Sequence, residues 1–537
     1  MRRSIGHRRV RCAIAMLSRH LNPILPVALL ATPWLWPFAG GPTPAVMPWL
    51  ASVACACVFV LSWAWGGLKV EAVIARAWLL AALLSSVLGL LQYFGAADGL
   101  QPWVSMTKVG EAFANLRQRN HFATLTNLGL SVLLWGPVAL ARGSPAVAQQ
   151  PRSKWCAPGW LTLAMAALLA LGNASSSSRT GAVQLALLVA FALMWAGPRQ
   201  RAVWSVLGAA VTTYAISVFM LPYLLGLNPF WDGIAGRFQG EGIACGSRRI
   251  LWSNVLHLIA QKPWWGWGWG ELDYAHFLAE YDGPRFCQIL DNAHNLPLHL
   301  AVELGVPLAF GVCALGLCLL WRGRPWREQD ATRRMAWAVL ALILLHSMLE
   351  YPLWYGPFQL ASALSIALLL RARAPRSPAT VGAGAGMPGQ WRLAASLMAL
   401  LGLLATAYAA WDYWRVSQIY VAPEARARAY MSDTLEKISG SWLFANQVRF
   451  AELATTDLTP GNAARVAALS EELLHFSPES RVVEQRIESA LLLGREEEAQ
   501  SYIARYKTVF PKEYAQWAYL RSVAAPDEPV QDPPTAP

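Results

Sequence analysis

The stretch DNAHNLPLHL (291–300) places a candidate catalytic base directly before a long apolar run. His294 lies there between Asn292 and Asn295, with His299 five residues further on. A histidine exchanges a proton near neutral pH, so His294 could act as a general base, with the two asparagines as donors to a substrate or to its ring. The alternative is a histidine satisfied by neighbouring backbone groups. We expect His299 to be structural.

Three arginines are candidates for binding a diphosphate group. Arg179 follows a run of serines in NASSSSRTG, and Arg248 and Arg249 begin the amphipathic segment GSRRILWSNVLHLIAQKP. A guanidinium group offers several N–H donors in one plane, which suits the oxygens of a diphosphate. The alternatives are a structural anchor for Arg179 and two solvated arginines at a helix start for the pair.

Two further segments place polar side chains at the ends of apolar runs. In LLHSMLEYPLWYGPF, His346 and Glu350 are four residues apart and share a helix face, and Tyr351 follows. A glutamate inside an apolar run is a candidate functional residue, with His346 or an arginine as its partner. The segment NLRQRNHFATL begins another apolar run, where an interfacial cap is the alternative to substrate binding by Gln118, Asn120 and His121.

The apolar runs between these segments predict the elements that must position them. The chain has 537 residues, of which 55% are hydrophobic and 14% charged, against about 25% charged in a soluble protein. A bilayer core requires roughly 20 apolar residues per helix. We therefore predict a mainly α, polytopic membrane protein with about eleven transmembrane helices. The expected spans are 22–38, 46–66, 72–91, 121–141, 158–173, 180–197, 202–221, 296–320, 335–350, 353–370 and 391–411.

The basic residues predict the orientation of these spans. The net charge of +12 comes from short segments between apolar runs, which is typical of cytoplasmic loops rather than of a nucleic-acid-binding face. We place the basic N-terminus, residues 1–20, in the cytoplasm. No small-residue cleavage site follows the first apolar run, so we expect an uncleaved helix. Eleven spans then put loop 222–295 and all five polar segments on the outer face.

The chain changes character after the last apolar run. We assign residues 21–413 to the transmembrane domain, which includes the outer loop, and 414–525 to a soluble helical domain on the periplasmic side. Residues 476–511 look like one helix–turn–helix unit of the tetratricopeptide type, with Ala490 and Ala499 at the helix contact. The tail, 526–537, is expected to be disordered.

Cysteine usage adds one constraint on the outer loop. Cys245 and Cys287 are the two cysteines in that loop, and the sequence leaves open whether they form a disulfide or remain free thiols. No zinc-binding pattern is present, and we expect no cofactor. Neither a Ser-His-Asp order nor a phosphate-binding glycine loop is evident. Arginines, histidines and a glutamate at one membrane face therefore favour transfer chemistry on a lipid-linked diphosphate.

Several segments resemble the O-antigen ligase/polymerase superfamily, and in particular its bacterial protein O-oligosaccharyltransferase branch, the pilin glycosylation ligases. They are SRRILWSNVLHLIAQKPWWGWGWGELDYAHF, DNAHNLPLHLAVELGVP and HSMLEYPLWY. The family's motif histidine falls on His294, its loop arginine on Arg248 with Arg249 adjacent, and the arginine after the serines on Arg179. NLRQRNHFATL resembles the Gln-x-Asn-His segment, although Arg119 stands where the family has proline.

The resemblance implies a metal-independent glycosyltransferase in a bacterial inner membrane, with its active face in the periplasm. Its donor would be a glycan on undecaprenyl diphosphate, and its acceptor a Ser or Thr hydroxyl of a pilin-type or periplasmic protein. His294 would be the base, Glu350 would orient it or place His346, and the arginines would bind the diphosphate. Alternatives are ligation to lipid A–core, polymerisation of repeat units, transport of the lipid-linked glycan, and a scaffold.

Overall fold

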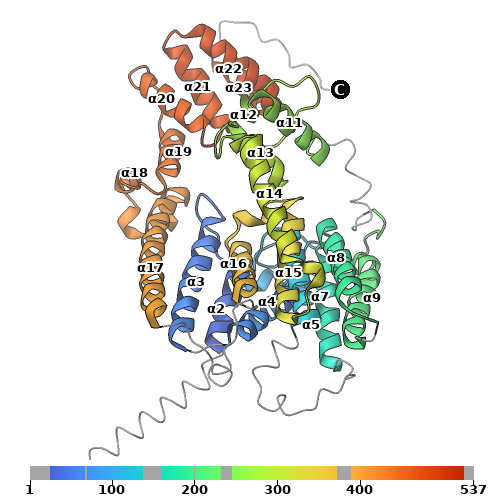
Figure 1. The fold of residues 1–537 in the computed structure, drawn as a ribbon. Coiled ribbons are helices and arrows are strands. Elements are labelled where there is room, and N and C mark those ends of the chain that lie inside the picture. The colour runs from blue at the N-terminus through green and yellow to red at the C-terminus, as the bar shows by residue number, and fades with distance from the viewer. Residues whose placement is uncertain are drawn as a thin grey trace, which may run out of the picture. The chain divides into compact units, whose positions relative to one another are not determined.

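The computed structural model describes residues 24–66, 69–136, 159–198, 200–231, 245–371 and 389–524, and all regular elements in these ranges are helices (Figure 1). The basic N-terminus (1–20), the tail (526–537) and the basic loop at 142–154 lie outside the described residues. The chain divides into two compact units. The first comprises 1–241 and 316–411, and the second comprises 242–315 and 412–537.

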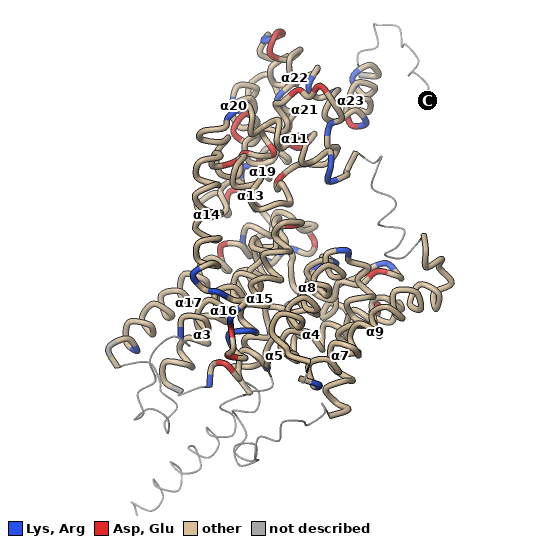
Figure 2. The backbone as a smooth tube through the Cα atoms, turned by 45° about the vertical axis from the view of Figure 1, so that its right-hand side comes forward, with Lys and Arg blue, Asp and Glu red and all other residues tan. Residues whose placement is uncertain are grey.

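The first unit is a bundle of apolar helices. Its helices are α2 (Ile24–Leu35), α3 (Val46–Gly66), α4 (Val70–Tyr93), α5 (Arg119–Trp135), α7 (Trp160–Ser175), α8 (Arg179–Trp195), α9 (Arg201–Leu224), α15 (Ala331–Ser347), α16 (Gly356–Arg371) and most of α17 (Gly389–Ser417). Short 3-10 turns, η1 (Asp98–Leu100), η2 (Pro325–Arg327) and η3 (Pro352–Trp354), join some of them. Figure 2 shows that these helices carry few charged residues along their length.

Helix α5 is the centre of this bundle. It packs against α4, α7, α8 and α15, and residues 121–135 are all buried. A helix surrounded by other helices can carry polar side chains if they are hydrogen-bonded: Thr124 and Asn127 bond to neighbouring helices, and Ser131 bonds to the carbonyl of Leu128 in α5 itself. The buried hydrogen bonds around α5 therefore hold polar side chains in fixed positions.

Glycines allow the helices around α5 to approach closely. A Cβ added at Gly172 would lie 2.5 Å from Ser86 Oγ, and one added at Gly181 would lie 2.3 Å from Asn173 Oδ1. Small residues at such contacts are typical of helix packing in membranes, where close van der Waals contact replaces the hydrophobic effect. Gly181 lies in the first turn of α8, directly after the serine run.

Five described helices are long and apolar enough to cross a membrane, as expected of a polytopic membrane protein. They cover Val46–Trp65, Val70–Tyr93, Arg201–Leu224, Val306–Arg327 and Trp391–Tyr420. Four shorter apolar helices are Ile24–Leu35, Trp160–Ser175, Arg179–Trp195 and Gly356–Arg371. The mainly helical membrane class is thus supported, whereas the count of eleven spans stays a prediction.

The prediction of one continuous helix at 296–320 is wrong. The structure has a short helix, α13 (Leu296–Leu304), and then α14 (Val306–Gly323), separated by Gly305 with φ 86°. A side chain at Gly305 would lie 2.2 Å from the carbonyl oxygen of Trp264. The helix therefore breaks because another backbone segment packs against this point.

The second unit combines the outer loop with the C-terminal helices. Its loop helices are α11 (Arg248–Gln261), α12 (Leu272–Leu278) and α13, and its C-terminal helices are α18 (Thr434–Ile438), α19 (Ala445–Thr455), α20 (Ala463–Leu474), α21 (Ser480–Leu492), α22 (Glu496–Val509) and α23 (Pro511–Ala524). Three 3-10 turns, η5 (Gln418–Tyr420), η6 (Pro423–Ala425) and η7 (Arg428–Tyr430), precede α18. Phe277 of α12 joins the apolar core of the C-terminal helices. The loop and these helices therefore share one core.

The expected helix–turn–helix at 476–511 corresponds to α21 and α22. Gly494 lies between the two helices with φ 73°, and Ala490 and Ala499 are both buried, at 1% and 0% exposure. Pro511 ends α22 but also begins α23, which the sequence did not indicate. Membership of the tetratricopeptide type stays a prediction.

Candidate functional site

Three sequence segments of the first unit meet at Asn120. The Asn120 side chain donates from Nδ2 to Glu350 Oε1 at 3.0 Å and accepts from Ser178 Oγ at 2.6 Å. Ser178 also caps helix α8, because its Oγ accepts from the backbone N–H of Gly181 at 3.0 Å. The starts of α5 and α8 and the end of α15 are thus joined by one chain of hydrogen bonds.

His346 lies inside the same bundle, one turn before Glu350. Its exposed fraction is 0%, and Nδ1 lies 2.9 Å from the hydroxyl of Thr124. Gln184 of α8 donates to the same hydroxyl at 2.9 Å and to the carbonyl of Leu342. The His346 side chain therefore forms part of a buried network that links α5, α8 and α15.

The remaining predicted residues of the first unit lie around this network. His121 is 1% exposed, and its ring packs 4.1 Å from that of Tyr355 between centroids. Arg179 is the first residue of α8, directly after Ser178, and is half-buried. Gln118 precedes α5, and its buried Oε1 has no hydrogen-bond partner among the described residues. Tyr351 stacks on Tyr355 at 6.1 Å.

The backbone of His294, in the second unit, has a fixed and unusual conformation. It adopts φ 50°, a left-handed conformation that few residues other than glycine adopt. Asn292 Oδ1 accepts from the His294 backbone N–H at 2.9 Å, and Asn295 Oδ1 caps α13 by accepting from the backbone N–H of Leu298 at 3.1 Å. The side chains of both asparagines in the motif thus bind backbone N–H groups and fix the local backbone.

Trp252 connects α11, which begins with the two arginines, to the segment that contains His294. Its indole Nε1 donates to the carbonyl of Ala293, the residue before His294, at 3.1 Å. Arg248 lies four residues before Trp252, so the two share one face of α11. Arg248 is half-buried, whereas Arg249 is exposed. The Arg-x-x-x-Trp spacing therefore places Arg248, and not Arg249, on the helix face that meets the His294 segment.

Helix α11 packs one face on the core of the outer loop. The buried residues of that face are Leu251, Asn254, Val255 and Leu258, and Ile250, Trp252 and Ile259 pack partly buried against the same core. Leu256 is 54% exposed. The buried face packs on the loop's own core, because Asn254 is bound through both side-chain atoms to residues 284 and 286.

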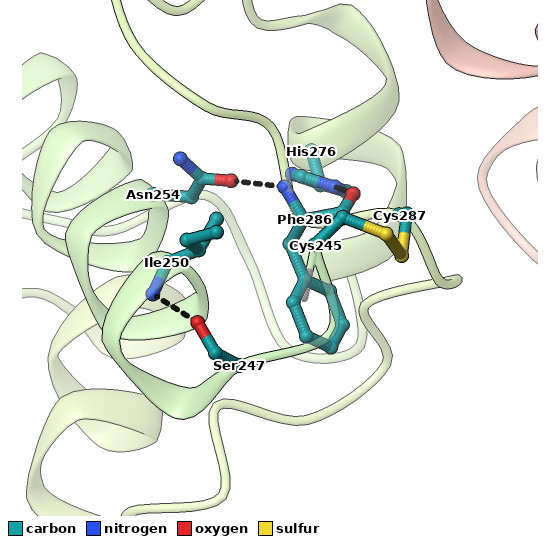
Figure 3. Close-up of a disulfide and its surroundings, with 7 residues drawn as sticks. All are labelled: Cys245, Ser247, Ile250, Asn254, His276, Phe286 and Cys287. Carbon is teal, nitrogen blue, oxygen red and sulfur yellow. Dashed lines mark hydrogen bonds between the residues drawn. A yellow bond between two sulfur atoms is a disulfide. The ribbon is translucent and has the colours of Figure 1, made fainter. Parts of the chain in front are cut away.

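A disulfide joins the start of α11 to the segment that leads to His294. Cys245 and Cys287 are bonded across a sequence separation of 42, with Cα atoms 5.4 Å apart (Figure 3). Nearby, Phe286 is fixed from both sides, because its N–H donates to Asn254 Oδ1 at 2.8 Å and its carbonyl lies 3.1 Å from His276 Nε2. The disulfide and these bonds hold the two arginines near one end of the loop's core.

The Trp/Gly run packs backbone against backbone on the end of α13. Trp267 N–H donates to the carbonyl of Val302 at 2.8 Å, and Gly268 N–H donates to that of Glu303 at 3.0 Å. A Cβ at Gly266 would lie 2.3 Å from the Glu303 carbonyl oxygen. The glycines of WWGWGWG therefore permit close contact with α13.

Two buried carboxyl groups lie in this part of the second unit. Burial is the main cause that raises the pKa of Asp273 and that of Glu303 to about 7, and the nearby carboxylate of Glu271 contributes to the rise of both. His299, 2% exposed, lies with Nε2 3.5 Å from Glu303 Oε2, and burial lowers its pKa to about 4. His299 is therefore a core residue, as its position inside an apolar run indicates.

The structure thus assembles the predicted residues in two groups. Asn120, His346, Glu350 and Arg179 belong to the first unit, and Arg248, Arg249 and His294 to the second. Sequence reasoning missed Ser178, Thr124 and Gln184, although Thr124 follows Asn120 by four residues. Within the described ranges no three His, Cys, Asp or Glu side chains form a metal site, and metal independence stays a prediction.

Three ranges of the chain that contain these residues match known protein families. Residues 164–313 match the family described as O-antigen ligase, 334–524 match "virulence factor membrane-bound polymerase, C-terminal", and 112–135 match "protein glycosylation ligase". The chain is similar to the general O-oligosaccharyltransferase of Acinetobacter baylyi (strain ATCC 33305 / BD413 / ADP1). The two are 24% identical over 368 residues, which cover 65% of this chain and 61% of that protein.

Proposed function

Because residues 164–313 match the O-antigen ligase family and the chain is similar to a general O-oligosaccharyltransferase, we propose that it is a glycosyltransferase that attaches a glycan to proteins. The donor is a glycan on undecaprenyl diphosphate, moved en bloc to a Ser or Thr hydroxyl of a pilin-type or periplasmic protein. The reaction takes place at the periplasmic face of the inner membrane and requires no metal ion. The similarity to a general O-oligosaccharyltransferase favours a protein acceptor.

The observation that carries this proposal is the hydrogen bond that joins α11 to the His294 segment. Trp252 bonds to the residue before His294, and Arg248 lies on the same helix face as Trp252. Transfer from a diphosphate requires a base that accepts a proton and a cation that stabilises the leaving group, and these two segments carry one of each.

The proposed step forms one bond and breaks one. The acceptor hydroxyl attacks the anomeric carbon, its proton passes to the His294 ring, and the bond from that carbon to the diphosphate oxygen breaks. Undecaprenyl diphosphate leaves with the electron pair. Arg248, assisted by Arg249, stabilises the charge that gathers on the diphosphate, and Arg179 is proposed to bind the same kind of group.

The Asn120–Glu350 pair is proposed to bind substrate hydroxyls at the end of the first bundle. Its members hold each other at 3.0 Å, and Ser178 fixes the other end of the amide. His346 supports the pair from the core and is a positioning residue. Gln118 and Tyr351 are proposed to take part in this candidate surface, and the buried His121 to support it from within the bundle.

The test is reconstitution with a defined donor and acceptor. The purified full-length protein is mixed with undecaprenyl-diphosphate-linked glycan and a pilin-type protein, and the acceptor is analysed by mass spectrometry. We expect the glycan mass on a Ser or Thr residue, and the same product after exhaustive chelation. A product that appears only with a divalent ion would contradict the metal-independent scheme, and glycan found only on lipid A–core would contradict the protein acceptor.

A second candidate is polymerisation of lipid-linked repeat units, which the match of residues 334–524 to a membrane-bound polymerase favours. The donor chemistry is the same, but the acceptor is then the terminal sugar of a second lipid-linked glycan. Omitting the protein acceptor separates the two: a polymerase lengthens the lipid-linked glycan, whereas a protein glycosylation ligase leaves its length unchanged.

A further inference from the structure

An open pocket of about 380 Å³ lies within the second unit, outside the residues to which a role is assigned above. One wall comes from the Trp/Gly run, and the other from α19 and from the end of α20. The lining residues are Trp269, Gly270, Glu271, Asn446, Glu472, His475 and Phe476. The outer loop and the C-terminal helices thus form this pocket together.

The lining combines an aromatic plane with hydrogen-bonding groups. The indole of Trp269 is 62% exposed although it belongs to a segment packed on α13. Asn446 and Glu472 offer an amide and a carboxylate beside it. A sugar ring has an apolar C–H face and a rim of hydroxyls, so this lining fits a sugar: the ring stacks on the indole while the hydroxyls bond to the polar groups.

The charges of the pocket favour a neutral ligand. Glu271 Oε2 lies 2.8 Å from His475 Nδ1, and Glu472 Oε1 lies 2.7 Å from Arg449 Nη1. Because each carboxylate has a cationic or proton-donating partner, the pocket has no uncompensated negative charge to attract a basic peptide. The carboxylate oxygens still accept hydrogen bonds from hydroxyls.

The pocket is attached to the helix that follows His294. The ring of Trp269 lies 6.2 Å from that of His299, centroid to centroid, and the backbone of the Trp/Gly run bonds to Val302 and Glu303. His299 is the fourth residue of α13 and lies five residues after His294 in the chain. His294 does not line the pocket, so a ligand there lies beside the helix that follows His294 rather than at His294 itself.

We propose that this Trp269 pocket binds a neutral sugar of the lipid-linked glycan, beyond the unit whose anomeric carbon reacts. The inference rests on the proposed function, because it assumes that His294 acts at the first sugar of that glycan. It gives the second unit a role in selecting donors by length: a glycan long enough to reach Trp269 gains a contact that a single sugar lacks.

The test measures donor binding without any transfer. The full-length protein in lipid nanodiscs is titrated with undecaprenyl diphosphate carrying either one N-acetylglucosamine or a chain of four, with no acceptor present. We expect the four-sugar donor to bind about tenfold more tightly, as one aromatic stacking contact provides. Trp269→Ala should bind both donors alike, and Trp269→Phe should recover part of the preference.

Trp265→Ala is the matched control, because Trp265 is 89% exposed in the same run and does not line the pocket. It should keep the full preference. Equal binding of the two donors by the parent protein, or a preference that survives Trp269→Ala, would overturn the proposal. Glycan transfer without a preference for the longer donor would contradict the sugar-binding pocket and leave the proposed function standing. A preference for the longer donor without transfer to any acceptor would contradict the proposed function and leave the pocket standing.

Discussion

His346 in the first unit is held by its side chain, whereas His294 in the second unit is held by its backbone. The His346 ring has no exposed surface and bonds to Thr124, with the ring of Phe358 5.7 Å away. The half-buried His294 receives its main-chain bond from Asn292 and adopts φ 50°. Both histidines lie in polar segments next to apolar runs, but only one of them is part of a packed core.

The two histidines illustrate two different roles. One stabilises the packing of the bundle, and the other is the candidate reacting group. A ring enclosed in a bundle stabilises helix contacts, and substrate cannot reach it without a change in the packing. A left-handed conformation at a non-glycine residue costs about 1–3 kcal/mol and persists where the surrounding structure imposes it, often at functional sites. The comparison therefore favours His294 as the reacting group and His346 as its structural counterpart.

The largest expected effect is that of His294→Ala. Loss of a general base should slow glycan transfer by roughly 10²–10⁴-fold, while the donor binds with nearly unchanged affinity. The measurements are initial transfer rates and donor titration on the same protein preparation. His257→Gln, on α11 and hydrogen-bonded to Gln261 at 2.9 Å, is the matched control and should retain transfer. Glycan transfer at the parent rate by His294→Ala would show that His294 is not the base.

Arg248→Ala should have the next largest effect, and its comparison with Arg249→Ala distinguishes the roles of the two adjacent arginines. Loss of one cation at the leaving group is expected to cost about 3 kcal/mol, or roughly 100-fold in rate. Arg249→Ala should cost less than about tenfold, because its side chain lies on another face of α11. Equal losses in the two variants would show that the Arg248–Trp252 face does not determine which arginine acts.

His346→Ala should lower stability more than chemistry. The change leaves a cavity in the core and removes the bond to Thr124, so we expect a loss of about 2–4 kcal/mol in the free energy of unfolding. Thermal unfolding in detergent measures this. His346→Gln retains a hydrogen-bonding group and should restore both the fold and transfer per folded molecule. A stable His346→Gln protein without transfer would assign His346 a chemical role.

Opening the Cys245–Cys287 disulfide should destabilise the second unit. A loop of this length is stabilised by roughly 2–4 kcal/mol when closed, mainly because the unfolded chain is restricted. Treatment with dithiothreitol, or replacement of both cysteines by serine, should lower the unfolding temperature of this unit and slow transfer. The double variant provides the control, since the reductant should have no further effect on it.

The smallest expected effect concerns pH and the buried carboxyl of Asp273. Its pKa rises from 3.8 to about 7 on folding because of burial, so the folded state binds more protons than the unfolded state between these values. Stability therefore falls as pH rises through this range and is constant above it. Asp273→Asn should remove this loss and raise the unfolding midpoint by about 2–4 °C above pH 7. The exposed Asp282→Asn should change the midpoint equally at every pH.

The sequence predicted local features with short-range causes. The helix that begins at Arg248 and the helix–turn–helix unit at 476–511 both appear in the structure, because caps and turn residues act within one helical turn. The break at Gly305 escaped prediction, since it depends on the carbonyl of Trp264, 41 residues earlier. The hydrogen bond from Ser178 to Asn120 escaped prediction for the same reason.

The sequence by itself indicated the helical membrane class, the segments that are candidates for chemistry and the resemblance to the O-antigen ligase superfamily. Composition, apolar run length and motif residues are properties of the chain that folding does not alter. Only the tertiary structure decided that Asn120 bonds to Glu350, that His346 is enclosed while His294 is held by its main chain, and that the outer loop shares a core with the C-terminal helices. These outcomes depend on which distant segments pack together, and a side chain's environment is set by that packing rather than by its neighbours in sequence.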